Sequence, residues 1–187
     1  MKKIYIITTY TGTVLSYLIR NISKTPYAHV SIALNQELNP MYSFGRLNPK
    51  TPIFAGFVEE NINEGLYAIR TNTMCRVYSL EVTELQYERL YENIMVVSNS
   101  RKSYDYDIMA LIYLSINKPR EADYKYVCSH FVADMLKKSG LNIFDKEPCA
   151  IRPNDFYDLA HLTLEYEGLL SKYNALEHSY IPIVAEI

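Results

Sequence analysis

The sequence predicts a single α+β domain in which a strand-rich first half is followed by a helical second half. Strands with one early helix are expected up to about residue 82, and mainly helices are expected from residue 83 onward. No repeat, low-complexity tract or linker divides the chain. The 187 residues, of which 49% are hydrophobic, are enough to bury one core. We therefore expect one domain over residues 1–187.

The first half is predicted to contain most of the strands. Strands are expected at 3–9, 28–35, 40–45 and 75–82, and a helix is expected at 14–22. The stretch 47–72 is rich in proline, glycine and asparagine, which predicts a loop with short extended pieces.

The second half begins with a helix start signal. Thr83-Glu84-Leu85-Gln86 forms a capping box, and the helix that follows has an apolar side. Further helices are expected at 105–115, from Cys128, and at 155–162, where Pro153 or Asn154 opens the helix. A final strand is expected at 164–168. Strands followed by helices, rather than alternating with them, are typical of the α+β class.

Cys128 is expected in the first turn of an amphipathic helix. The apolar spacing after it and Gly140 after two lysines fix the two ends of this helix. Free amides and the helix dipole favour a thiolate there, and such cysteines have pKa values of roughly 3.5 to 7.5 against about 8.5 for a free cysteine. The same amides can receive an oxyanion. The alternative is that Cys128 is a small buried hydrophobe. His130 points to a different side of the helix and is expected to pack or cap.

His29 is expected on a strand. Val30 and Ile32 alternate with His29, Ser31 and Ala33, so that one face is bulky and the other carries the imidazole followed by small residues. The small face would let a helix approach the sheet closely near the histidine. Without Cys128, the pattern around His29 would equally indicate an ordinary histidine at the edge of a strand. A thiol at a helix start and an imidazole from a strand are together the parts of a nucleophilic cysteine site.

These two motifs resemble a known family. The segments YAHVSI, at 27–32, and VCSHFVA, at 127–133, are similar to the circularly permuted branch of the NlpC-type papain-like superfamily, in which the histidine precedes the cysteine. The same order occurs in the lecithin:retinol acyltransferase-like enzymes. The resemblance covers most of the chain, including 41–46 and 151–155. It implies a small antiparallel β-barrel or sheet that carries the histidine and packs against a helical half that carries the cysteine.

The resemblance implies a thiol hydrolase that acts as a peptidase or amidase at an amide or ester carbonyl. Cys128 would be the nucleophile, and His29 would be the general base and then the general acid. The substrate would be a small peptide, for example one of the cell-wall type. The alternatives are an acyl-lipid hydrolase or acyltransferase, and a ligand-binding relative without turnover. No cofactor is expected.

A third residue orients the imidazole in this family, and it comes from the next strand or close to it. The predicted strand holds no His, Asp, Glu or Asn within 41–45. Ser43 is the first candidate, because it shares a small-residue face with Gly45, although it equally fits a residue that only fills a tight sheet position. The other candidates are Tyr42, which is out of phase, and Glu59 and Glu60 on the following loop.

Other features yield further expectations. Tyr10 follows the first strand and is a candidate cleft residue, and the irregular stretch 48–63 is a candidate lid. A zinc site built from a histidine and Cys75, Cys128 and Cys149 is a weak alternative, because these residues lack metal-ligand spacing. Eighteen tyrosines also allow a ligand-binding surface without catalysis.

Composition excludes several classes of protein. The formal charge of −2 and a pI near 6.1 give no sign of a nucleic-acid partner. Three cysteines form no disulfide framework, which favours a reducing compartment such as the cytoplasm. The start, Met1-Lys2-Lys3, only superficially resembles a signal peptide, since polar residues soon interrupt the apolar stretch. No segment is long and apolar enough to span a bilayer.

Overall fold

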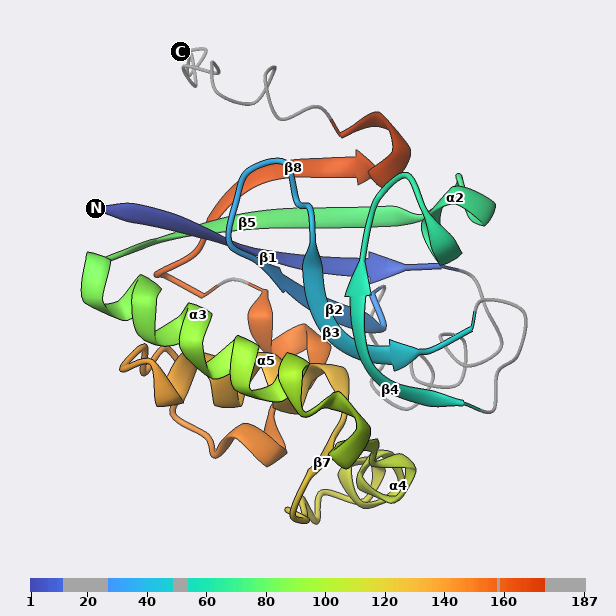
Figure 1. The fold of residues 1–187 in the computed structure, drawn as a ribbon, viewed down its shortest axis with the longest axis vertical. Coiled ribbons are helices and arrows are strands. Elements are labelled where there is room, and N and C mark those ends of the chain that lie inside the picture. Colours follow the sequence, from blue (N-terminus) through green and yellow to red (C-terminus); the bar gives the residue numbers. More distant parts are fainter. Residues whose placement is uncertain (12–26, 49–53, 158, 174–187) are drawn as a thin grey trace.

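An open six-stranded antiparallel sheet forms the centre of the protein (Figure 1). The computed structural model describes residues 1–11, 27–48, 54–157 and 159–173. The strand order is β4-β3-β2-β1-β5-β8, so that β4 and β8 are the two edges of the sheet in the described part of the chain. The strands are β1 (Lys2–Tyr10), β2 (His29–Ala33), β3 (Met41–Arg46), β4 (Ala55–Glu60), β5 (Met74–Val82) and β8 (Thr163–Leu169). The expected mixture of helices and antiparallel strands is confirmed, but the sheet does not close into a barrel.

Four α-helices lie within the described residues. They are α2 (Gly65–Ile69), α3 (Glu84–Asn99), α4 (Ile108–Ser115) and α5 (Cys128–Lys138). Two short parallel strands, β6 (Asp105–Tyr106) and β7 (Lys125–Tyr126), flank α4 in the chain. Short 3₁₀ turns occur at Arg101–Ser103, Pro148–Ala150, Pro153–Phe156 and Leu170–Lys172. None of the helices among these residues has both the length and the apolar character that crossing a membrane requires.

Helices α3 and α5 cover one face of the sheet (Figure 1). Val30 and Ile32 of β2 join their buried side chains in the main core. Phe131 of α5 lies at its centre, with its ring 5.3 Å from Phe44 and 5.7 Å from Phe57. Burying such a side chain contributes about 1.5–3 kcal/mol relative to exposing it.

The helix that contacts the small face of β2 is α2, and not the cysteine helix α5. Helix α5 packs on the bulky face, because Val30 and Ile32 offer it apolar area to bury. Ala33 belongs to a second cluster on the other face, together with Tyr67 of α2 and Cys75 of β5. The small residues therefore make room for α2 and for polar groups described below.

Local signals predicted the helix starts with varying success. The capping box is confirmed, since Thr83 accepts a hydrogen bond from the Gln86 amide at 3.2 Å and Gln86 accepts one from the Thr83 amide at 2.9 Å. The helix expected at 105–115 begins later, at Ile108. Asp107 caps this helix by accepting a hydrogen bond from the Ala110 amide at 2.9 Å, while the two residues before it form β6.

Three expectations differ from the structure or lie outside it. The stretch 47–72 contains β4 and α2, and β4 pairs along its whole length with β3, so residues 55–60 of the expected lid at 48–63 are part of the sheet, while residues 49–53 lie outside the described residues. The helix expected at 155–162 is only a 3₁₀ turn at Pro153–Phe156, where Pro153 supplies the first residue. The helix expected at 14–22 lies outside the described residues.

Candidate active site

Cys128 is the first residue of α5, as the sequence predicted. The first hydrogen bond of the helix runs from the Phe131 amide to the Val127 carbonyl at 3.0 Å, so the amides of residues 128–130 precede the helical ladder. Ser129 fixes this end of the helix by donating its hydroxyl to the Ile151 carbonyl at 2.6 Å. Cys128 itself is only 3% exposed. The thiol therefore lies in a sheltered position at a helix N-terminus.

His29 meets Cys128. The Cys128 side chain is close enough to contribute to the raised pKa of the His29 imidazole. This proximity is possible because His29 is the first residue of β2, so that its side chain lies at the end of the strand. The two residues selected from the sequence, about a hundred positions apart, are thus brought together.

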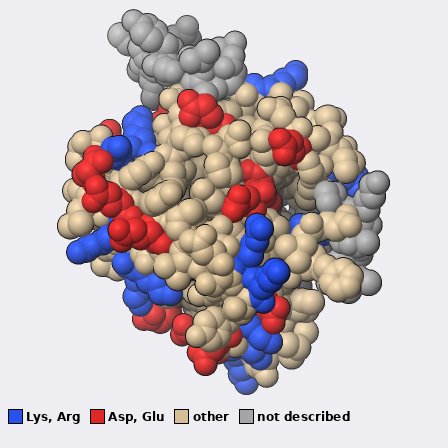
Figure 2. Space-filling view, viewed as in Figure 1, with Lys and Arg blue, Asp and Glu red and all other residues tan. Residues whose placement is uncertain are grey.

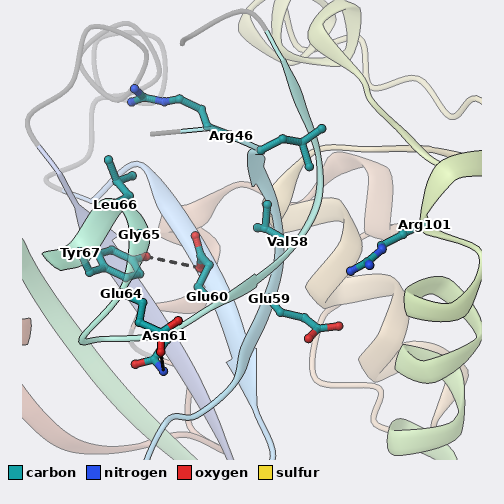
Figure 3. Close-up of a pocket in the computed structure, with 11 residues that line it drawn as sticks. Arg46, Val58, Glu59, Glu60, Asn61, Glu64, Gly65, Leu66, Tyr67 and Arg101 are labelled. Atoms are coloured by element: carbon teal, nitrogen blue, oxygen red, sulfur yellow. Dashed lines mark hydrogen bonds between the residues drawn. The ribbon is translucent and has the colours of Figure 1, made fainter. Parts of the chain in front are cut away.

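Glu60 holds the other side of the imidazole. Nε2 of His29 lies 3.0 Å from Oε1 and 3.2 Å from Oε2 of Glu60. Two hydroxyls also donate to Oε2: that of Ser31 at 2.6 Å and that of Tyr67 at 3.4 Å, the latter drawn in Figure 3. The side chains of His29 and Glu60 are 19% and 14% exposed. The carboxylate is therefore fixed by several donors in a nearly buried position.

The electrostatics of this pair favour its charged form. Burial disfavours the imidazolium, but the Glu60 carboxylate and hydrogen bonds to Cys128 and Glu60 outweigh it and raise the pKa of His29 from 6.5 to about 10. Burial likewise opposes ionisation of Glu60, yet the His29 charge and hydrogen bonds from His29, Ser31 and Tyr67 hold the pKa of its carboxyl below the usual 4.5. Nε2 is the ring nitrogen that faces Glu60.

Gly45 makes room for this arrangement. A Cβ atom at Gly45 would lie 3.4 Å from Cε1 of His29 and 3.8 Å from Oε1 of Glu60. A methyl group would make only ordinary contacts there, so Gly45 matters because it keeps any longer side chain away from the imidazole and from the Glu60 carboxylate, which comes from β4.

Ser43, the preferred third residue, is placed differently from the expectation. Its hydroxyl is fully buried and donates to the main-chain carbonyl of Val30 at 2.7 Å. The face predicted for Ser43 and Gly45 is the face of His29, but a serine side chain is short. The longer side chain of Glu60, one of the alternatives, makes the contact with the imidazole instead.

The remaining candidates for the third residue lie elsewhere. Tyr42 is buried in the main core, on the face that α3 and α5 cover. Glu59 accepts a hydrogen bond from the Ser98 hydroxyl of α3 at 2.9 Å. Neither of these two side chains contacts His29 among the interactions of the described residues. Tyr10, the candidate cleft residue, ends β1 opposite Met74 of β5.

The other histidine near the thiol packs, as expected. The His130 ring lies 4.7 Å from the Tyr126 ring, and burial lowers the pKa of His130. Tyr106 is a residue that the sequence analysis missed. Burial, and then the nearby Cys128, raise the pKa of Tyr106 well above its usual value, so its phenol belongs to the surroundings of the thiol. No local sequence pattern marks Tyr106, just as none marks Ser31 or Tyr67 as partners of Glu60.

The three cysteines are free thiols in different surroundings. Cys75 lies in the cluster on the opposite face of the sheet from the core that contains Cys128, and burial raises its pKa to about 12. Burial also raises the pKa of Cys149. Among the described residues, no three side chains of His, Cys, Asp or Glu are grouped so that they could hold a metal ion. The cysteines of the zinc hypothesis are therefore not assembled in a site.

A cleft of about 310 Å³ adjoins the site (Figure 3). Its lining comes from the end of β3, from β4, from the start of α2, and from Arg101 after α3. Glu60 and Tyr67 line the cleft, whereas Cys128 and His29 do not. The cleft thus meets the thiol site through the carboxylate that holds the imidazole. Acidic and basic side chains are interspersed on the face of the molecule in Figure 2.

Comparison with known proteins assigns no family to this chain. No protein-family model matches it, and a search of curated proteins also finds no match. A functional assignment therefore depends on the residues of the site and their geometry.

Proposed function

We propose that the protein is a thiol hydrolase that cleaves an amide bond, with a permuted papain-like arrangement of its catalytic residues. One observation carries this proposal: the His29 imidazole contacts the Glu60 carboxylate and is close enough to the Cys128 side chain for it to help raise the pKa of the imidazole. A nucleophile, a base and a group that orients the base are the three parts of such sites on unrelated folds. The order of the histidine strand and the cysteine helix in the chain fits the permuted branch.

The reaction we propose has two halves. The Cys128 sulfur attacks the substrate carbonyl, and the amides of residues 128–130 stabilise the oxyanion. The His29 imidazolium then gives its proton to the leaving amine as the carbon–nitrogen bond breaks, which leaves a thioester on Cys128. In the second half, neutral His29 takes a proton from a water molecule, which attacks the thioester and releases the acid and the thiolate.

Glu60 sets the resting state in this mechanism. A histidine with a pKa of about 10 is an imidazolium at neutral pH, so it holds the proton that the leaving amine needs. Its neutral form arises only after that proton has been given away. Glu60 stabilises the imidazolium and fixes Nε2. Glu60 therefore takes the orienting role that the sequence analysis first gave to Ser43.

An acyl lipid is the second candidate substrate, and helix α4 is the observation that favours it. Ile108, Ile112 and Ile116 at this helix are 60%, 52% and 56% exposed. A cluster of exposed apolar side chains is typical of a surface that binds an apolar partner. Tyr106, near Cys128, lies just before this helix. The attack on an ester or amide carbonyl would be the same for this substrate.

The compartment we propose is the cytoplasm. Cys75, Cys128 and Cys149 are all free thiols, and a nucleophilic thiol stays reactive where disulfides do not form.

Alkylation tests the nucleophile without knowledge of the substrate. We expect iodoacetamide to modify Cys128 at about pH 6, where an ordinary cysteine, with a pKa near 8.5, reacts slowly. Mass spectrometry locates the modified residue, and the partly exposed Cys149 is an internal control. His29→Ala should slow the modification of Cys128 and leave that of Cys149 unchanged. Equal rates at Cys128 and Cys149 in the wild-type protein would contradict the proposal.

Turnover is tested with two substrate panels, one of peptides and one of acyl lipids. We expect hydrolysis of at least one panel by the wild-type protein and none by Cys128→Ala. Saturable binding that survives Cys128→Ala, with no hydrolysis by the wild-type protein, would favour a binding relative instead.

A further inference from the structure

The cleft beside Glu60 wraps around the edge strand β4. Glu59 and Glu60 are neighbours on this strand and so point to opposite faces of the sheet, yet both line the cleft. Arg46 at the end of β3 and Arg101 are its two basic residues. Figure 3 shows how these side chains surround the space.

Arg46 is a half-buried cation without an anionic partner. Within the described residues, its guanidinium forms no hydrogen bond and no ion pair. Burial, and then the positive charge of Arg70, lower the pKa of Arg46. A half-buried guanidinium next to a second positive charge is electrostatically unsatisfied, and a bound anion would relieve both costs.

The acidic residues of the cleft already have partners. Glu60 holds His29, Glu59 accepts the Ser98 hydroxyl at 2.9 Å, and Glu64 accepts the Asn61 amide at 3.4 Å. Figure 3 shows Arg46 at the opposite end of the cleft from Asn61 and Glu64. The Arg46 end is therefore the place where an anion can bind without meeting Glu64.

The chemistry places the leaving half of a substrate on this side of the thiol. His29 protonates the leaving amine, so that amine lies beside the imidazole. Glu60 contacts the imidazole, with Nε2 of His29 3.0 Å from Oε1, and it also lines the cleft that Arg46 lines. A leaving group beside the imidazole can therefore extend past Glu60 into the cleft, where Arg46 is one of the two basic residues.

From these observations we infer that the Arg46 end of the cleft binds a free carboxylate on the leaving amine, so that the substrate is an acylated amino acid or a peptide cut before its C-terminal residue. This inference rests on the proposed hydrolase function and names its substrate class. Water adds across the amide, the acyl half leaves Cys128 as a carboxylic acid, and the other half is released as an amino acid whose nitrogen carries the proton from His29. Arginine suits this role because its planar fork matches a carboxylate with two hydrogen bonds.

The first experiment compares matched substrates. Each peptide or acyl amino acid of a panel is made with a free C-terminal carboxylate and with a C-terminal amide, and kcat/KM is measured for both. We expect the wild-type protein to prefer the carboxylate by about 10- to 100-fold, as for a hydrogen-bonded ion pair. Arg46→Gln should bring this ratio close to one, and Arg46→Lys should leave an intermediate ratio because it keeps the charge but not the fork.

Arg89→Gln is the matched control. Arg89 is an exposed arginine of α3 outside the cleft, so its loss removes the same charge from the protein but should not change the ratio. Hydrolysis without a preference for the carboxylate would overturn the inference and leave the hydrolase proposal standing.

The second experiment measures binding, independent of turnover and of the stability of an Arg46 variant. Cys128→Ala is titrated with N-acetylglycine and with N-acetylglycinamide while the NMR signals of Arg46 and its neighbours are followed. We expect saturable shifts with the carboxylate at concentrations where the amide produces none. Such binding without hydrolysis of any panel member would support the carboxylate site and count against the hydrolase. Equal responses to both compounds would overturn the inference.

Discussion

Replacing Glu60 with glutamine tests the ion pair at the centre of the site, because it removes the charge and keeps the shape of the side chain. The surroundings raise the pKa of His29 from 6.5 to about 10, a difference of about 3.5 units. At 1.36 kcal/mol per unit, this is at most about 5 kcal/mol in favour of the imidazolium. Glu60 supplies much of this energy and Cys128 part of it. In Glu60→Gln the opposing effect of burial remains, so the pKa of His29 should fall to about 6.5 or below.

The same pair makes stability depend on pH in a defined way. Because folding raises the pKa of His29, its contribution is complete below pH 6.5 and is lost as the pH rises through about 10. Because folding lowers the pKa of Glu60, its contribution is present above 4.5 and is lost as the pH falls below that value. The free energy of unfolding should therefore differ most between wild type and Glu60→Gln from pH 4.5 to 6.5.

NMR titration of the imidazole Cε1 protons measures the pKa directly, with His29→Ala to assign the signal. In the wild-type protein the His29 signal should not titrate between about pH 5 and pH 8, where ordinary histidines do. In Glu60→Gln it should titrate in or below that range. Glu59→Gln is the control, since Glu59 is the next residue but contacts Ser98 instead of His29. A His29 midpoint near pH 6.5 in both wild type and Glu60→Gln would refute the ion pair.

Two further variants separate the neighbouring residues. Ser43→Ala removes the hydroxyl that donates to the buried Val30 carbonyl at 2.7 Å, so urea unfolding should show a loss of about 1–3 kcal/mol while the His29 titration stays unchanged. A changed titration would return Ser43 to the orienting role. Gly45→Val places carbon atoms where His29 Cε1 is 3.4 Å away, and we expect displacement of the imidazole to slow alkylation of Cys128 on the order of 10²-fold. Unchanged alkylation would mean that this position of the imidazole is not required.

The parts of the fold that the sequence predicted well have local signals. The capping box at Thr83 and the apolar spacing after Cys128 depend on residues within a few positions of each other. Strand β4 was expected only as a short extended piece of a loop. Its residues Ala55–Glu60 lack a regular alternation, and pairing with β3 is what makes them a strand. This edge of the sheet could therefore not be predicted from the sequence.

The same distinction holds within the candidate site. Cys128 and His29 were predicted because a helix start and a strand pattern place each of them separately. The contact between Glu60 and His29 depends on how the strands pair, because the two residues come from β4 and β2, which lie on either side of β3. Strand alternation identified the correct face of β3 but says nothing about the length of the side chain needed. Ser43 was preferred for its face, and Glu60 makes the contact because of its reach.

Strand β4, which is an edge of the sheet in the described part of the chain, connects the two proposals. The family resemblance also allowed a closed barrel, in which β4 would pair with a strand on each side. A neighbouring strand would then fill the cleft that Glu59 and Glu60 line. In the open sheet, Glu60 contacts His29 and the cleft at the same time. A substrate carboxylate bound at Arg46 would therefore lie in the same cleft as Glu60, the residue that we propose orients the imidazole. If Glu60→Gln alters both the His29 titration and the binding of N-acetylglycine, recognition and catalysis share this carboxylate; if it alters only the titration, the cleft and the thiol site are adjacent but independent.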